Sequence, residues 1–179
     1  MERLDLFPTV IYRFNSELDT IKLVERVLEL EVGKDLHYGQ DSGGLQGGGL
    51  ILQDIDFHDT HDWIKEQISK TFNRKFTITD VWVSIYDKGD YNKIHNHPPT
   101  NPTYYDNEMW AGVFYIKTND EGGELLIHSP QNPTNTYDIK PREGELILFN
   151  SNTYHSVTPN QSDEKRICLA FNFILENEQ

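Results

Sequence analysis

The chain has 179 residues, a length that fits one domain with a sizeable hydrophobic core. Its 16 Lys and Arg residues stand against 29 Asp and Glu residues, and the formal net charge of -13 repels phosphate backbones, so we expect no bulk binding of nucleic acid. The sequence has no apolar run of about 18 residues and no secretory signal pattern, and its one cysteine, Cys168, excludes an internal disulfide. These features predict a soluble protein of the reducing cytoplasm without membrane segments.

The N-terminal part, residues 1 to about 75, is predicted to be mainly helical. A short apolar run over residues 6–12 contains a proline and is typical of an edge strand. Ser16 opens an amphipathic segment that ends near Gly33, and the spacing of its apolar residues predicts a helix. A second helix is expected around Asp59 to Asn73, because apolar residues recur there at four-residue spacing: Ile64, Ile68 and Phe72.

From Phe76 to about residue 175, the apolar residues follow a period of two, which is typical of strands. In the first of these segments, one set of residues faces one way (Val81, Val83 and Ile85) and the other set faces the opposite way (Trp82, Ser84 and Tyr86). Gly and Pro turns separate the segments that follow. We therefore expect a single domain over residues 1–179 that is mainly β with flanking helices, with a double-layered or barrel-like antiparallel sheet.

Three histidines in this β-rich part suggest a metal site. His95 and His97 are two residues apart in an extended segment, so their side chains point to the same side. They precede the proline-rich loop that starts at Pro98, where side chains can reach the mouth of a cavity. With the distant His155 as a third ligand, about half of an octahedral ion would stay open for reacting ligands.

Several short motifs follow one another in the second half of the chain. They are Tyr86-x-x-Gly89, His95, Gly112-Val-Phe-Tyr-Ile, Glu121-Gly-Gly-Glu-Leu, Pro141-Arg-Glu-Gly-Glu-Leu-Ile-Leu-Phe-x-Ser, His155-Ser-Val-x-Pro159 and Arg166. As an ordered set over about residues 80–174, they resemble the 2-oxoglutarate- and iron(II)-dependent oxygenases. The resemblance is greatest to the prolyl-hydroxylase-like branch and its small bacterial and phage members. It implies a double-stranded β-helix, the cupin-like jelly roll.

The resemblance also implies a non-haem Fe(II) bound by a His-x-Asp/Glu pair and a distal histidine. His95 falls on the first ligand position and His155 on the last, whereas His97 stands where many relatives have the carboxylate. A carboxylate would lower the net charge of the bound ion by one, so the difference matters. Two alternatives follow: His97 is itself the third ligand, or Asp106 or Glu108 on the next loop supplies an oxygen.

The cosubstrate implied by the resemblance is 2-oxoglutarate. Arg166 falls where the family has the basic residue that pairs with the far carboxylate of this molecule, and a guanidinium meets a carboxylate through two parallel hydrogen bonds. The alternative for Arg166 is a surface salt bridge with Asp163 or Glu164.

Two tyrosines match family residues of the same pocket. Tyr86 matches one that lines the cosubstrate site, and Tyr115 falls where another often hydrogen-bonds the carboxylate. Either tyrosine could instead be an ordinary barrel aromatic. Cys168 stands where the family often has Ser or Thr, which weakens that secondary contact.

The substrate side is expected in the loops. The segments 39–49 and 98–109 are rich in glycine or proline and are candidates for a lid. Tyr105 and Trp110 could present an aromatic wall to the substrate, and His128, at the end of its strand, is a further candidate for substrate contact.

The reaction implied by the resemblance is hydroxylation of an unidentified peptide or small molecule, with conversion of 2-oxoglutarate to succinate and CO2. Two other interpretations stay open. In one, the three histidines of a cupin-type protein hold iron, zinc or another ion without 2-oxoglutarate, and Arg166 is dispensable. In the other, the chain is a non-catalytic jelly roll of structural or virion type, which predicts no stoichiometric metal.

Overall fold

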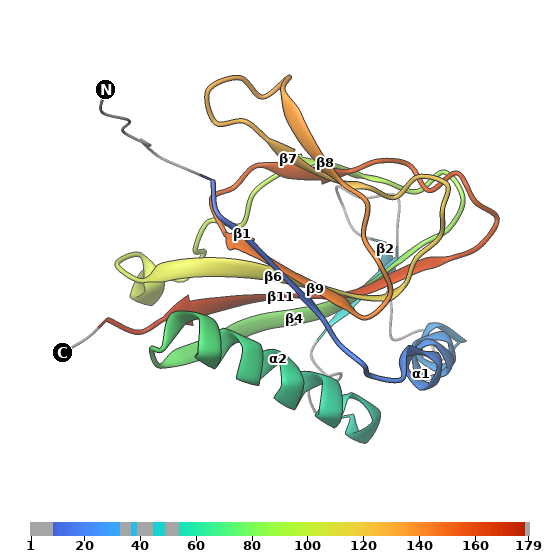
Figure 1. Cartoon of the computed structure of the whole chain (residues 1–179), viewed down its shortest axis with the longest axis horizontal. Coiled ribbons are helices and arrows are strands. Elements are labelled where there is room, and N and C mark those ends of the chain that lie inside the picture. The colour runs from blue at the N-terminus through green and yellow to red at the C-terminus, as the bar shows by residue number, and fades with distance from the viewer. Residues whose placement is uncertain (1–8, 33–36, 39–44, 49–53, 178–179) are drawn as a thin grey trace.

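The computed structural model describes residues 9–32, 37–38, 45–48 and 54–177. Its core consists of two antiparallel sheets that face each other (Figure 1). In order across the sheet, the larger one contains β1 (Ile11–Asn15), β9 (Glu145–Asn150), β6 (Glu108–Lys117), β11 (Arg166–Leu175), β4 (Phe76–Tyr86), β3 (Leu45–Gly48) and β2 (His37–Tyr38). The smaller one contains β5 (Asn92–His95), β10 (His155–Val157), β7 (Leu125–His128) and β8 (Thr136–Ile139).

From β4 onward, the chain passes back and forth between the two sheets. β4, β6, β9 and β11 belong to the larger sheet, and β5, β7, β8 and β10 to the smaller one. Two antiparallel sheets connected in this way form a jelly roll, so the predicted double-stranded β-helix is confirmed. The opening at one end of such a sandwich is where ligands can enter.

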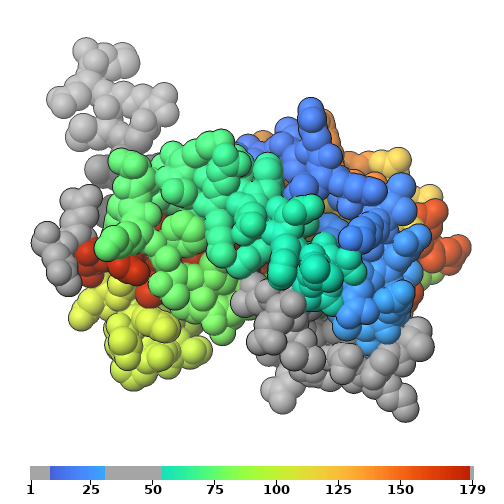
Figure 2. Space-filling view, turned by 90° about the horizontal axis from the view of Figure 1, so that it is seen from below, coloured from blue at the N-terminus to red at the C-terminus, as the bar shows by residue number. Residues whose placement is uncertain are grey.

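Two helices, α1 (Thr20–Val32) and α2 (His58–Phe72), cover the outer face of the larger sheet. Figure 2 shows both helices side by side on this face of the molecule. Short 3-10 turns occur at Ile55–Phe57 and Pro102–Tyr104. None of the described helices has the length and apolar content that crossing a membrane requires.

The long central strands separate two hydrophobic cores by simple alternation. Val81, Val83 and Ile85 of β4 pack toward the helices, as do Leu169 and Phe173 of β11. The intervening residues face the space between the sheets, where a second cluster contains Tyr86, Tyr115, Ile127, Phe149 and Cys168. The sheet therefore has one face that is packed by helices and one face that is free to build a site.

The N-terminal part differs in detail from the prediction. It is not only helical, because β1, β2 and β3 join the larger sheet. The predicted strand over residues 6–12 starts outside the described residues, and the strand that the structure shows is β1, at the sheet edge. Residues 45–48 of the expected glycine-rich loop form β3, and the rest of that loop, residues 39–44 and 49, lies outside the described part.

The helix boundaries are close to those predicted, and the caps explain the differences. The amide of Ile21 donates to the side chain of Asp19 at 3.0 Å, so α1 begins at Thr20. Ser16 does not cap this helix, because its hydroxyl donates to the carbonyl oxygen of Gly144 at 2.9 Å. α2 ends before Asn73, whose left-handed φ of 49° is a common way to terminate a helix.

Candidate metal centre and cosubstrate cavity

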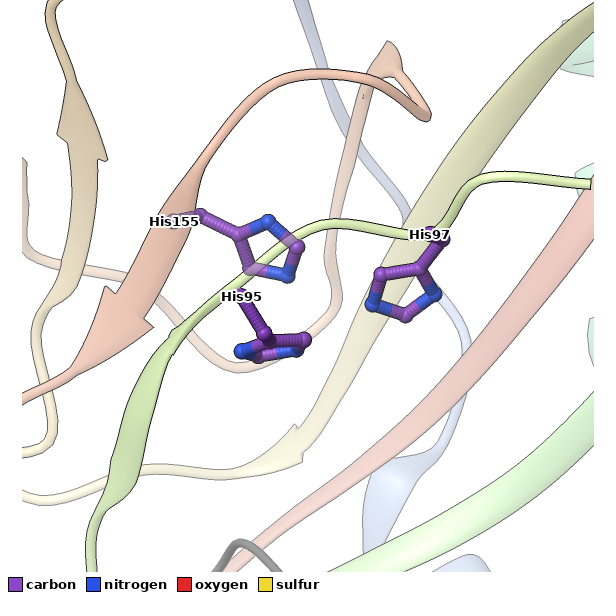
Figure 3. A group of neighbouring side chains, drawn as sticks. All are labelled: His95, His97 and His155. Atoms are coloured by element: carbon purple, nitrogen blue, oxygen red, sulfur yellow. The ribbon is translucent and has the colours of Figure 1, made fainter.

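Strand pairing brings two of the three histidines together. β10 pairs with β5 so that His155 lies directly opposite His95. His97 follows β5 by two residues, and its amide donates to the carbonyl oxygen of Ser151 at 2.8 Å, which holds it beside the end of β9. The three rings surround a common space in Figure 3, and one ring nitrogen from each lies within 4.8 Å of the others.

The hydrogen bonds of the three rings fix which nitrogen is available. Nδ1 of His95 contacts the carbonyl oxygen of Lys93 at 2.7 Å, and Nδ1 of His155 contacts that of Thr153 at 2.9 Å. Nδ1 of His97 contacts the side-chain oxygen of Asn172 at 2.9 Å. Because an oxygen acceptor needs a proton on Nδ1, each neutral ring has its lone pair on Nε2. Among the described residues, Nε2 of His97 is buried without a hydrogen-bond partner.

Burial keeps the His97 and His155 rings neutral. Burial, together with a smaller effect of the nearby His95, lowers the pKa of His97 to about 4. Burial also lowers the pKa of His155 well below its ordinary 6.5. Neutral imidazoles are the form that binds metals, so an ion does not have to displace protons from these two residues near pH 7. The donor set fits Fe(II) and other divalent ions of its kind.

The alternative ligands are directed elsewhere. Glu108 accepts hydrogen bonds from Arg74 at 2.8 Å and from the indole of Trp110 at 3.0 Å, on the helix side of the sheet. Asp106 is exposed on the preceding loop. Within the described ranges, the His95, His97 and His155 group is the one cluster that could hold a metal ion.

The histidines line one end of a cavity between the two sheets. The cavity has a volume of about 40 Å³. Its walls come from the inward-facing residues of β4, β6, β9 and β11, with Leu125 and Val157 of the smaller sheet opposite. Small side chains at Ala111, Cys168 and Ala170 leave its centre open.

Arg166 lies in the same cavity and is 2% exposed. Its Nε donates to the carbonyl oxygen of Gly123 at 3.0 Å, and its guanidinium carbon lies 4.8 Å from the ring centre of Tyr86 and 5.1 Å from that of Tyr115. The alternative for Arg166, a surface salt bridge with Asp163 or Glu164, does not form, because Asp163 pairs with Lys88 and Glu164 pairs with Lys117.

No carboxylate among the described residues forms an ion pair with Arg166. A buried charge without a counterion is costly. The guanidinium therefore provides a strong site for an anion that enters the cavity.

The two tyrosines frame this guanidinium. Burial raises the pKa of Tyr86 to about 12 and raises that of Tyr115 as well, so both phenols keep their protons. The Tyr115 hydroxyl is fully buried and has no hydrogen-bond partner among the described residues. A donor in this position is suited to a carboxylate held by Arg166. Cys168 lies beside it, with its sulfur 3.6 Å from Arg166 Nη1.

The structure does not bring the expected substrate residues to the cavity. Trp110 points to the helix side, where its ring lies 4.7 Å from that of Phe72. Tyr105 is 62% exposed on the loop before β6. His128 points away from the space between the sheets, and its ring contacts the carbonyl oxygen of Pro133 and the hydroxyl of Ser156. None of the three is among the described residues that line the cavity.

Three further residues shape the site and were missed from the sequence. Gly123 has a φ of 73°, and a Cβ atom there would lie 2.7 Å from Arg166 Cδ. Asn172 accepts from His97, and Trp82 stacks on the His97 ring with centroids 5.6 Å apart. The alternation in the sequence already placed Trp82 on the same face as Ser84 and Tyr86, but only the folded chain shows that Trp82 and Asn172 reach His97.

Comparison with known proteins agrees with this geometry. The family model described as "Putative 2OG-Fe(II) oxygenase" matches residues 80–172, which include all three histidines and Arg166. No match was found among curated proteins.

Several solved structures share the fold. A prolyl-4-hydroxylase of Pseudomonas putida superposes with a TM-score of 0.69 at 16% identity, covering 94% of this chain and 93% of that one. A viral collagen prolyl hydroxylase of Paramecium Bursaria Chlorella virus-1, in complex with 2OG, gives 0.68 at 18% identity over 93% and 96%. A prolyl hydroxylase of Trichoplax adhaerens with a bound peptide fragment gives 0.70 at 19% identity over 92% and 82%.

The family match covers more than half of the chain and contains the histidine cluster and the buried arginine. The solved structures share its overall fold. The chain belongs to the 2-oxoglutarate- and Fe(II)-dependent oxygenases, and it is an oxidoreductase that uses iron and 2-oxoglutarate.

Proposed function

We propose that His95, His97 and His155 hold the Fe(II) ion and that Arg166, assisted by Tyr115, anchors 2-oxoglutarate in the cavity. The observation that carries this assignment is a buried guanidinium without a carboxylate partner among the described residues, in the same cavity as three clustered imidazoles. A dianion would satisfy both groups, because it would neutralise the buried charge of Arg166 and could supply oxygen ligands to an ion held by the histidines.

The bound iron and cosubstrate supply the oxidising chemistry, which converts 2-oxoglutarate and dioxygen to succinate and CO2 while a substrate C–H bond is hydroxylated. The chain positions the reactants. Arg166 offers two parallel N–H donors to the far carboxylate, and Tyr115 offers its hydroxyl. The ring of Tyr86 covers the guanidinium, and the apolar walls at Leu125 and Phe149 exclude water.

The substrate we propose is a peptide or a small molecule. Among the neighbours with this fold, one is described with a bound peptide fragment, and two others as prolyl hydroxylases. The formal charge of -13 is unsuited to a polynucleotide. The loop over 98–109, with the exposed Tyr105, is our candidate for a lid over the mouth. We place the activity in the cytoplasm, where a reducing environment preserves Fe(II) and the Cys168 thiol.

The first test is spectroscopic. Anaerobic addition of Fe(II) and 2-oxoglutarate should produce the weak visible absorption band of the iron chelate at about 500 nm. Fe(II) alone should not produce it. Binding of one ion per chain with no band on adding 2-oxoglutarate would instead favour a three-histidine metal protein without this cosubstrate.

The second test separates the two halves of the site. His95→Ala and His155→Ala should lose both the metal and succinate formation, whereas Arg166→Gln should retain the metal and lose 2-oxoglutarate affinity by about 30-fold or more. His128→Ala is the matched histidine control, because this ring lies outside the cavity. Arg13→Gln is the arginine control, since Arg13 pairs with Glu145 at 2.7 Å outside the cavity lining. Succinate formation that survives in His95→Ala and His155→Ala would refute the metal assignment.

A further inference from the structure

The His97 ring differs from the other two in what holds it. His95 and His155 each place Nδ1 against a carbonyl oxygen two residues earlier in their own segment, so their tautomers are set locally. His97 instead meets the side chain of Asn172, which lies 75 residues away in the sequence on β11. Its tautomer therefore depends on a distant residue.

We propose that Asn172 is a positioning residue that holds His97 in the tautomer protonated at Nδ1 and so directs Nε2 toward the metal. The inference rests on the proposed function, because it assumes that His97 is the third ligand. Asn172 is then the residue that enables a histidine to bind the metal at a position where relatives often have a carboxylate.

The contact of His97 with Trp82 shows why a hydrogen bond is needed. The two rings are stacked with an interplanar angle of 20°, which fixes the plane of the imidazole. Stacking does not distinguish the two orientations related by a ring flip, which exchange Nδ1 with Cδ2 and Nε2 with Cε1, so that a carbon takes the place of the metal-binding nitrogen. The Asn172 oxygen, 2.9 Å from Nδ1, selects one of them.

Asn172 is itself held firmly. It is 8% exposed in the middle of the sheet, opposite Asp80 of β4 and Ala111 of β6. The register of β11 against β4 shifts between Asn172 and Phe173, and the hydroxyl of Thr79 donates to the Asn172 carbonyl oxygen at 3.3 Å. Irregularities of this kind change the direction of a side chain near active sites.

The test compares Asn172→Leu, which removes the acceptor, with Asn172→Asp, which keeps an oxygen at the same place. In metal-free protein, nitrogen NMR of the His97 ring reports the tautomer directly. In wild type and Asn172→Asp, we expect the proton on Nδ1, and in Asn172→Leu, a mixture of tautomers. Titration with Co(II) should show a Kd that is about 10- to 100-fold weaker for Asn172→Leu and no weaker for Asn172→Asp.

Asn107→Leu is the matched control. The side-chain amide of Asn107 donates to the carbonyl oxygen of Leu175 on β11. The Asn107→Leu variant therefore shows the effect of losing a side-chain amide contact to β11 at a place away from the histidines. It should keep the wild-type tautomer and Co(II) affinity. Should Asn172→Leu fail to fold, Asn172→Ser, whose side chain is too short to reach Nδ1, replaces it with the same expectations.

An unchanged His97 tautomer together with a Co(II) affinity within about twofold of wild type in Asn172→Leu or Asn172→Ser would overturn the inference. Failure of the wild-type protein to bind Co(II) would refute the metal site itself. The tautomer measurement needs no metal, so the two failures are distinguishable.

Discussion

The Arg166 side chain fits against Gly123 so closely that no other residue can occupy position 123 without moving it. Arg166 Nε donates to the Gly123 carbonyl oxygen at 3.0 Å, and an added Cβ would lie 2.7 Å from Arg166 Cδ. The turn that contains Gly123 therefore shapes the anion site as much as the arginine does.

Gly123→Ala should weaken 2-oxoglutarate binding. The methyl group displaces Arg166, and the loss of a charge-assisted hydrogen bond corresponds to about a 10- to 100-fold increase in KM for 2-oxoglutarate. The positive φ adds about 1–3 kcal/mol of backbone strain to the folded state. Gly89→Ala is the control, because Gly89 has a φ of 90° but nothing within 4 Å of an added Cβ. The Gly89→Ala variant should lose stability and keep the wild-type KM for 2-oxoglutarate. An equal change of this KM in both variants would contradict the proposed effect of the contact between Gly123 and Arg166.

Tyr115→Phe should affect binding and stability in opposite directions. The hydroxyl has no partner among the described residues, so its removal should leave the free energy of unfolding of the protein without cosubstrate unchanged or raise it by up to about 1 kcal/mol. The Kd for 2-oxoglutarate should rise about tenfold or more, because a hydrogen bond to a carboxylate is lost. Thermal unfolding and cosubstrate titration measure the two effects.

Tyr86→Phe provides the contrast for this experiment. The Tyr86 hydroxyl already has Ser84 and Asn92 as hydrogen-bond partners. Its removal should lower the free energy of unfolding by about 1 kcal/mol. A loss of stability in Tyr115→Phe equal to that in Tyr86→Phe would show that the Tyr115 hydroxyl has a structural partner.

Cys168 offers a chemical probe of the cavity without any mutation. It is the only cysteine in the chain, and it contacts Arg166 within the cavity lining. Burial raises the pKa of its thiol, so a small neutral thiol reagent should react slowly. Anaerobic addition of Fe(II) and 2-oxoglutarate should slow the reaction of the thiol with the reagent about tenfold further. Mass spectrometry of the labelled protein provides the rate, and a rate that is independent of 2-oxoglutarate would place the cosubstrate elsewhere.

Acid should destabilise the metal-free protein through its buried histidines. The pKa of His97 is about 4 in the folded state against 6.5 for an unperturbed histidine. Between these values the unfolded chain binds more protons than the folded one, so stability is complete above about pH 6.5 and falls as the pH approaches 4. His97 alone accounts for about 3 kcal/mol at pH 4. Urea unfolding of wild type and His97→Gln across this range should give curves that converge in acid, and parallel curves would contradict the shift.

Much of the fold could be predicted because the relevant signals are local. The alternation of Val81, Val83 and Ile85 with Trp82 and Tyr86 assigns one face of β4 to the helices and one to the cavity. By contrast, β8 was not predicted, because the short segment Thr136–Ile139 is polar and mostly exposed. The β3 strand was hidden by its glycines, which weaken any strand signal.

The parts of the site that escaped prediction depend on contacts between distant segments. Trp110 was predicted to present an aromatic wall to the substrate, but β6 begins at Glu108, and the alternation then places Trp110 on the same face as Phe114, toward the helices. Gly123 meets Arg166 only because the turn before β7 folds against the start of β11. The spacing of His95 and His97 suggested a pair of ligands, whereas the register that sets His155 opposite His95 is visible only in the folded chain.

The separation of the two cores by the central strands has a practical consequence. Packing against α1 and α2 holds the sheet together from one side, while the residues at Ala111, Cys168 and Ala170 on the other side are small and contribute little to that packing. Directed evolution could therefore change the pocket at these positions so that it binds new molecules. Most of the folding free energy, which comes from the packing of the sheet against the helices, would be retained.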